Sequence, residues 1–166
     1  MKKYIPALLI ALLIITTGSI HAARKAPGFA LMNNKGKFIY KSRLKGNLLI
    51  SFWASFCAPC KKEIPHLVEF EKKYGKSKNM RLILINVDKN DSSRSAKHKA
   101  DKTLQEIGVS HPYLMDLYHM ALQNYNPKKT VPATYLVNKH GYIVFAERGN
   151  KKNTLTRLER AIKKLP

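Results

Sequence analysis

The spacing of Cys57 and Cys60 constrains the fold and chemistry of this chain more than any other feature. The motif Cys57-Ala58-Pro59-Cys60 holds both cysteines of the sequence and lies between an apolar run, residues 47–53, and an amphipathic segment, residues 61–76. The apolar run predicts a buried strand, and the apolar spacing in the second segment predicts a helix. A disulfide across so short a loop removes little entropy from the unfolded chain, so it suits repeated formation and cleavage better than stabilisation.

The expected start of the helix distinguishes the two thiols. Pro59 suits a first helical turn, where no intrahelical N–H donor is needed. Cys57 then lies at the helix N-terminus, where free N–H groups and the helix dipole favour a thiolate. Cys60 lies one turn inside and is more shielded. We therefore expect Cys57 to attack a substrate disulfide and Cys60 to resolve the mixed disulfide.

A zinc site is the alternative interpretation of two cysteines at this spacing. It would need two further ligands, and no other cysteine is present. None of the six histidines forms a His-x(3–5)-His pair. We therefore expect no metal and no bound cofactor.

The N-terminus has the order of a secretory signal peptide. Met1-Lys2-Lys3 is positively charged, residues 5–15 are almost wholly apolar, and Ile20-His21-Ala22 provides a cleavage signal. The apolar run is shorter than the roughly 20 residues of a membrane-spanning helix, although an uncleaved anchor reaching residue 20 is the alternative. We expect a signal segment over residues 1–22, one compact domain over residues 23–166, and a periplasmic location.

The formal net charge of +21 raises the question of an anionic partner. Nucleic acid is disfavoured by the export signal and by the lack of an aromatic-basic motif that stacks bases. A solvated basic surface is one interpretation, and weak attraction to an anionic membrane surface is the other.

The sequence around the cysteines resembles the active-site stretch of TlpA/ResA-type thioredoxin-like proteins, which are exported bacterial thiol–disulfide oxidoreductases. The similar stretch, residues 52–65, reads Phe-Trp-Ala-Ser-Phe-Cys-Ala-Pro-Cys-Lys-Lys-Glu-Ile-Pro. The likeness continues through residues 27–31, 131–137 and 141–144, and so covers nearly all of residues 26–165.

The resemblance implies an α/β thioredoxin fold with a central mixed sheet flanked by helices. It also implies an N-terminal β-hairpin and a TlpA-type helix–strand insertion. Apolar patterns place the remaining strands at residues 29–32, 38–40, 81–87, 112–115, 134–137 and 142–146, and helices at residues 94–107, 117–124 and about 155–165.

Two site residues follow from the resemblance alone. Pro132 matches the cis-proline of thioredoxin folds, which faces the redox pair and helps to hold the substrate chain. Glu63 matches an acidic residue of ResA-type proteins that influences the acid–base behaviour of the pair, and burial would raise its pKa enough for it to take the proton of Cys60. Ser51 stands where thioredoxin carries a buried aspartate. The alternative is that Glu63 faces solvent.

The residues expected to contact substrate surround the same motif. They are Trp53, Phe56, Ala58, Pro59 and Val131. Trp53 is expected mainly to pack and form a wall of the site, and Phe56 replaces the tryptophan more often found before the first cysteine.

The expected function is reduction of periplasmic protein disulfides, including apocytochrome c cysteines during cytochrome c maturation. Ala58 replaces the histidine that stabilises the thiolate in strongly oxidising members, which favours a low potential. Such a reductant must be recharged by a membrane electron-donor protein. A disulfide oxidase or isomerase and a non-catalytic, redox-responsive binding module remain as alternatives.

Overall fold

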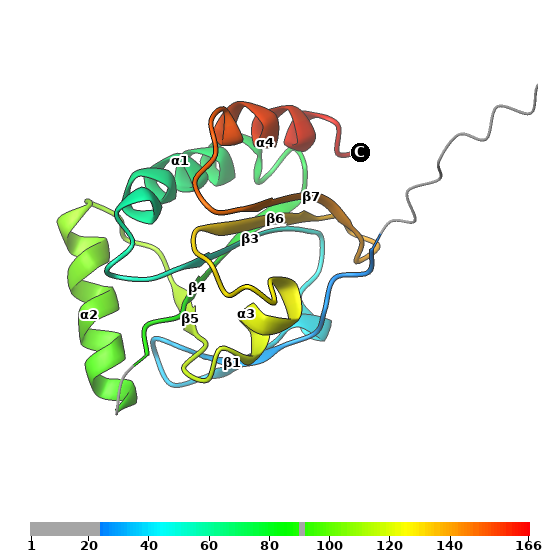
Figure 1. The fold of residues 1–166 in the computed structure, drawn as a ribbon. Helices are drawn as coiled ribbons and strands as arrows, with labels where there is room; N and C mark the ends of the chain where they lie inside the picture. The colour runs from blue at the N-terminus through cyan, green and yellow to red at the C-terminus, as the bar shows by residue number, and fades with distance from the viewer. Residues whose placement is uncertain (1–23, 90–91) are drawn as a thin grey trace, which may run out of the picture.

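A seven-stranded mixed sheet forms the centre of the computed structural model, which describes residues 24–89 and 92–166 (Figure 1). The strand order is β2-β1-β5-β4-β3-β6-β7. The strands are β1 (Ala30–Asn33), β2 (Phe38–Tyr40), β3 (Asn47–Trp53), β4 (Met80–Asn86), β5 (Tyr113–Met115), β6 (Ala133–Val137) and β7 (Ile143–Arg148). The helices are η1 (Lys41–Arg43), α1 (Ala58–Tyr74), α2 (Ser93–Glu106), α3 (Met120–Tyr125) and α4 (Thr154–Lys163).

Strand β3 lies in the interior of the sheet, and every one of its residues is buried. It pairs in parallel with β4 and antiparallel with β6, so that Ser51 is opposite Leu84 on one side and Thr134 on the other. A strand covered on both faces needs a nearly continuous apolar run, which is what the sequence provides here. Ser51 is an exception to this pattern, because it is a buried polar residue inside the apolar run.

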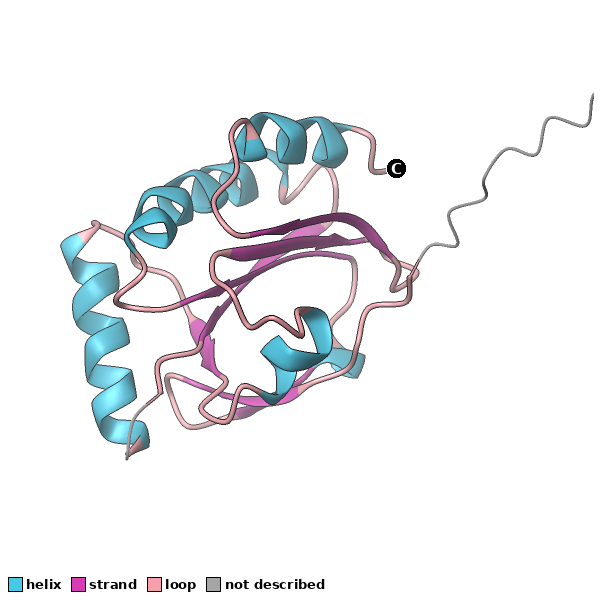
Figure 2. Ribbon diagram, viewed as in Figure 1, coloured by secondary structure: helices cyan, strands magenta, loops and turns pink. Residues whose placement is uncertain are grey.

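Helices α1 and α2 lie on one face of the sheet because they are successive crossovers in the same direction, from β3 to β4 and from β4 to β5. An ion pair of 3.6 Å between Lys61 and Glu106 joins these helices. Helix α4 packs beside α1 on that face. Helix α3 lies on the other face, as Figure 2 shows. There the ring of Tyr125 packs 5.4 Å from Phe52 and 5.0 Å from Tyr135, measured between centroids.

The predicted elements are present, and the differences are at their ends. The N-terminal hairpin β1–β2 and the helix–strand insertion, α2 with β5, are confirmed. Helix α1 begins at Ala58 with Cys57 as its N-cap, as predicted, and it ends at Tyr74 rather than at residue 76. Helix α3 begins at Met120 rather than at residue 117, because residues 116–119 form a turn in which the His119 amide donates to the Asp116 carbonyl at 3.0 Å.

The predicted signal segment, residues 1–22, lies outside the described residues. Within the part of the chain that the structure describes, no helix combines the length and apolar character that crossing a membrane requires.

Candidate active site

The cysteine motif lies where the C-terminal ends of the interior strands β3 and β4 form one side of the sheet, and we call this side the cysteine edge. Cys57 follows β3, and Pro132 is brought to the same edge because the next residue, Ala133, pairs with Phe52 near the end of β3. The amide of Gly149 donates to the carbonyl of Pro132 at 2.7 Å, which places the segment after β7 there as well. Three connections far apart in sequence, residues 54–57, 126–132 and 149–153, therefore meet at this edge.

Cys57 and Cys60 form a disulfide with a Cα–Cα distance of 5.2 Å. Cys57 is the N-cap of α1, and its sulfur accepts a hydrogen bond from the amide of Cys60 at 3.2 Å. Cys57 is 6% exposed and Cys60 is 1% exposed. The sulfur of Cys57 thus lies in the field of free helical N–H groups and is the more accessible of the two, as an attacking thiolate requires.

Asp88 fixes the loop that carries the cysteines. Its carboxylate accepts hydrogen bonds from the amide of Ser55 at 2.9 Å and from the side chain of Asn86 at 3.0 Å, and its side chain is buried. Asp88 was not among the site residues expected from the sequence. The available signal was an acidic residue just after a mostly apolar strand, a position where a buried carboxylate must find donors.

Glu63 points toward the sheet rather than toward solvent. The Thr134 hydroxyl donates to its carboxylate at 2.5 Å, and the Glu63 side chain is half-buried. Burial raises the pKa of Glu63 above its usual value, the Thr134 hydrogen bond opposes that effect, and the charge of Glu147 adds to it. Because Glu63 and Cys60 are three residues apart on α1, their side chains are neighbours on the helix surface.

A row of polar side chains crosses the sheet beneath Glu63. Ser51 on β3, Thr134 on β6 and Glu147 on β7 are successive partners in the register, and the Thr134 and Ser51 hydroxyl oxygens are 3.4 Å apart. None of these residues except Ser51 was considered from sequence. For Ser51 and Thr134 the signal was a polar residue inside an otherwise buried strand, since such groups are normally hydrogen-bonded. Glu147 had no such signal, because the other residues of β7 are exposed or half-buried.

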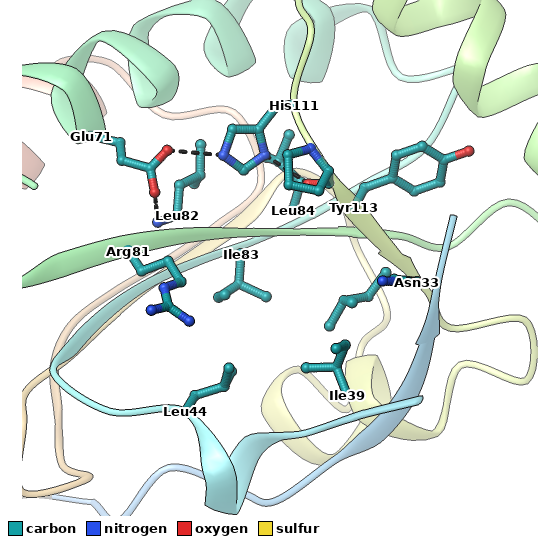
Figure 3. A pocket seen from close by; sticks show the side chains of 12 residues that line it. Asn33, Ile39, Leu44, Glu71, Arg81, Leu82, Ile83, Leu84, His111 and Tyr113 are labelled. Carbon is teal, nitrogen blue, oxygen red and sulfur yellow. Dashed lines mark hydrogen bonds and ion pairs between the residues drawn. The ribbon is translucent and has the colours of Figure 1, made fainter. Parts of the chain in front are cut away.

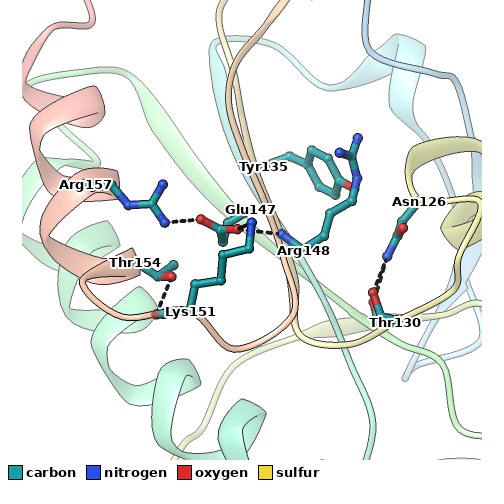
Figure 4. Close-up of polar contacts among 8 residues, drawn as sticks. All are labelled: Asn126, Thr130, Tyr135, Glu147, Arg148, Lys151, Thr154 and Arg157. Carbon is teal, nitrogen blue, oxygen red and sulfur yellow. Dashed lines mark hydrogen bonds and ion pairs between the residues drawn. The ribbon is translucent and has the colours of Figure 1, made fainter.

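Glu147 at the end of this row is buried, and two basic side chains pair with its carboxylate. Arg157 of α4 forms an ion pair with its carboxylate, and Lys151 forms a second at 2.9 Å (Figure 4). Burial alone would raise the pKa of Glu147, but the hydrogen bonds from Lys151 and Arg157 outweigh it and hold the pKa below its usual range. The carboxylate therefore stays charged near Glu63, which helps to keep Glu63 protonated at higher pH.

The residues predicted to contact substrate differ in their accessibility. Phe56 is 78% exposed. Ala58 is exposed, while Pro59 and Val131 are half-buried, and the Val131–Pro132 peptide bond is cis, as predicted. Trp53 is fully buried and packs edge-on against Tyr113 at 6.1 Å between centroids. In this oxidised state Trp53 is thus a packing residue behind the site and not a contact residue.

A separate cavity of about 340 Å³ lies toward the other end of β4 (Figure 3). It is lined mainly by apolar side chains, with Glu71, Arg81 and His111 at its polar side. Glu71 accepts a hydrogen bond from the Leu82 amide at 2.6 Å and lies 2.9 Å from the ring of His111. Strand β5 pairs with only residues 84–86 of β4. The Glu71 carboxylate therefore accepts the hydrogen bond of the Leu82 amide, which β5 does not reach.

Comparison with known proteins gives results that agree with this geometry. Residues 22–146 match the model of the AhpC/TSA family. The chain is 34% identical over 127 residues to the thiol-disulfide oxidoreductase ResA of Bacillus subtilis (strain 168), covering 76% of this chain and 66% of that protein, just under two thirds. It is 30% identical over 129 residues to ResA of Halalkalibacterium halodurans, covering 77% of this chain and 69% of that protein.

Solved structures share the same fold. A putative thiol:disulfide interchange protein DsbE from Chlorobium tepidum superposes with a TM-score of 0.72 at 25% identity, covering 85% of this chain and 94% of that one. StoA from Bacillus subtilis superposes with a TM-score of 0.60 at 23% identity, covering 82% of this chain and 96% of that one, and this second match bears on the fold alone.

Proposed function

Because the chain belongs to the AhpC/TSA family and is a ResA-type thiol–disulfide oxidoreductase, we propose that it is an exported reductant of protein disulfides. The observation that carries this proposal is the disulfide at the start of α1, with a more accessible Cys57 and a shielded Cys60 beside Glu63. We further propose that it works in the periplasm, on substrates that include apocytochrome c cysteines.

The reaction consists of two thiol–disulfide exchanges. The Cys57 thiolate attacks one sulfur of the substrate disulfide, so that a Cys57–substrate bond forms and the other substrate sulfur leaves as a thiolate. Cys60 then attacks the Cys57 sulfur, the intramolecular disulfide forms, and the second substrate sulfur leaves. Two electrons pass to the substrate, and the protein ends in the disulfide state that the structure holds.

Glu63 supplies the proton acceptor for the second exchange. Cys60 is shielded from solvent, so its thiol needs a nearby base to become a thiolate. A carboxylate whose pKa is raised by burial is a stronger base than an exposed one, and it can return the proton to the departing substrate thiolate. Thr134, by its hydrogen bond, positions this carboxylate.

The direction of electron flow rests on the residues beside the sulfurs. Ala58 and Pro59 between the cysteines offer no side-chain donor or charge to a thiolate, so stabilisation is limited to the helix terminus. A thiolate with little stabilisation gives a lower potential and favours the reductant. We propose that a membrane electron-donor protein regenerates the dithiol, and that Pro132, Val131 and Phe56 hold the substrate chain.

A peptide with a Cys-Ala-Ala-Cys-His disulfide tests this proposal as a substrate of the apocytochrome type. We expect the reduced soluble domain to transfer its electrons to the peptide almost completely, as measured by thiol trapping and mass spectrometry. Oxidised protein mixed with the reduced peptide should produce little exchange. Net oxidation of the peptide by the protein would instead make it a disulfide donor, and the absence of exchange in both directions would favour a non-catalytic binding module.

A further inference from the structure

The basic and acidic side chains around the disulfide differ in their exposure to solvent. Exposed lysines lie near the start of α1 and on the connections that carry Pro132 and follow β7; they are Lys62, Lys128, Lys129, Lys151 and Lys152. We call this set the lysine rim. A cleft of about 330 Å³ beside Pro59 is lined by both Lys62 and Lys151, which places members of the rim directly next to the cysteine motif.

The carboxylates at the cysteine edge are directed inward. Asp88 and Glu147 are 2% and 4% exposed, and Glu63 is half-buried against Thr134. Glu147 is shared between Arg157 and Lys151, so it leaves the rim in excess of positive charge. Glu106 at the end of α2 is the exception, because its side chain is 49% exposed, and it is paired with Lys61. Among the described residues of the connections 54–57, 126–132 and 149–153, none is an exposed carboxylate.

Two carboxylates of the described chain are exposed, Glu69 and Glu106, and Asp101 is half-buried. Glu69 and Asp101 project from the middle of α1 and the face of α2, where they interact with His66 and Lys97. Lysines on those surfaces are partly offset by acidic neighbours. The lysine rim therefore differs from a uniformly basic surface, because the described connections that carry Lys128, Lys129, Lys151 and Lys152 contain no carboxylate.

An apolar side chain completes this surface. Phe56, directly before Cys57, is 78% exposed although the residues on both sides of it are more covered. Interfaces commonly combine an aromatic centre with a polar rim, and the rim charges set the rate and specificity of encounter more than the final affinity.

We propose that the lysine rim selects protein substrates whose disulfide is flanked by acidic residues, with Phe56 contacting the chain beside the scissile bond. This inference rests on the proposed function and specifies its substrate class. The rim attracts such a segment over a distance of about one Debye length, roughly 10 Å at 0.1 M salt. A substrate flanked by lysines meets repulsion at the same place and exchanges more slowly.

Two synthetic peptides test the proposal, each with one cysteine blocked as a 2-pyridyl disulfide and flanked by either glutamates or lysines. Release of thiopyridone by the reduced protein gives the second-order rate constant. At low ionic strength we expect the glutamate peptide to react about tenfold faster than the lysine peptide. The ratio should approach one near 1 M salt. Equal rates at all salt concentrations would overturn the docking proposal and leave the reductase function intact, whereas no reaction with either peptide would remove both.

Matched charge-reversal variants locate the effect. The variant Lys62→Glu, Lys128→Glu, Lys152→Glu should invert the peptide preference at low salt. The control Lys45→Glu, Lys76→Glu, Lys139→Glu makes the same change in charge on exposed lysines at the opposite end of β3 and should retain it. If the control inverts the preference equally, the net charge and not the rim is responsible, and the proposal fails.

A membrane surface is the competing partner for the rim. Sedimentation with vesicles of phosphatidylglycerol and phosphatidylcholine distinguishes it. Vesicle binding that the rim variant abolishes, together with equal peptide rates, would assign these lysines to lipid and overturn the proposal. A faster reaction of the glutamate peptide than of the lysine peptide in solution, where no vesicle is present, supports the proposal.

Discussion

Replacing Cys60 with serine is expected to stop turnover after the first exchange and to leave the substrate covalently attached to Cys57. Cys60 supplies the only thiol that can resolve the mixed disulfide from within the protein, since the sequence has no other cysteine besides Cys57. Catalytic turnover of a disulfide peptide should fall to the background rate. Intact-mass measurement should show a protein–peptide adduct that dithiothreitol removes.

The matched variant Cys57→Ser distinguishes the roles of the two thiols. It should form no adduct at a comparable rate, because Cys60 is 1% exposed and lies inside the helix rather than at its N-cap. An adduct that forms readily on Cys60 in this variant would show that the assignment of attacking and resolving cysteine is reversed.

Replacing Glu63 with glutamine is expected to slow the second exchange by about 10²-fold near neutral pH, the lower end of what a positioned proton acceptor contributes. Glutamine can still accept the Thr134 hydrogen bond, so the helix should keep its place, but it cannot take the proton of Cys60. Rapid-quench trapping of the mixed disulfide measures this step separately from the first exchange. The rate of the variant should rise with pH, because the attacking species is the thiolate and solvent must then take the proton that Glu63 takes in the wild type.

The same variant should be more stable than the wild type at neutral pH. The raised pKa of Glu63 means that the folded protein holds this proton to a higher pH than the unfolded chain does. Stability from Glu63 is therefore fully present at low pH and is lost as pH rises from the ordinary carboxyl value through the folded pKa. Glutamine does not ionise, so the variant should have a higher Tm than the wild type at pH 7, and this difference should shrink toward pH 4.

Glu69→Gln is the control for both effects, because Glu69 lies on the same helix with a side chain that is 70% exposed. It should leave the rate of the second exchange and the pH dependence of Tm unchanged. A Glu63→Gln variant that behaves like this control would show that Glu63 has no part in proton transfer.

The order of elements could be predicted from this sequence because its strands and helices have distinct patterns. The run from Asn47 to Trp53 is buried throughout, as a central strand with both faces covered requires. Cys57 and Pro59 together indicated where α1 begins, and its N-cap is indeed Cys57. The boundary error at α3 arose because residues 116–119 form a turn with a left-handed His119, whose ring lies 2.7 Å from the Val87 carbonyl oxygen. Contacts of this kind between distant residues have no pattern in sequence.

The polar interior of the site could not be predicted in the same way. Thr134 meets Glu63 only because β6 pairs antiparallel with β3 and α1 crosses above that pair. Glu147 reaches the same place through β7, 96 positions along the chain from Ser51. Register between distant strands determines such contacts, and a single sequence does not specify it. Glu63 itself was proposed from family resemblance, and its burial against Thr134 is what the structure adds.

The equilibrium redox potential of the Cys57–Cys60 pair tests the central claim most directly. The soluble domain can be titrated against glutathione or dithiothreitol, with the fluorescence of its one tryptophan, Trp53, or thiol trapping as the signal. A dedicated reductant should have a potential clearly below about −220 mV, toward the thioredoxin end of the scale. A potential near −120 mV, the range of strong oxidants, would contradict this account and make the protein a donor of disulfides through the same two cysteines.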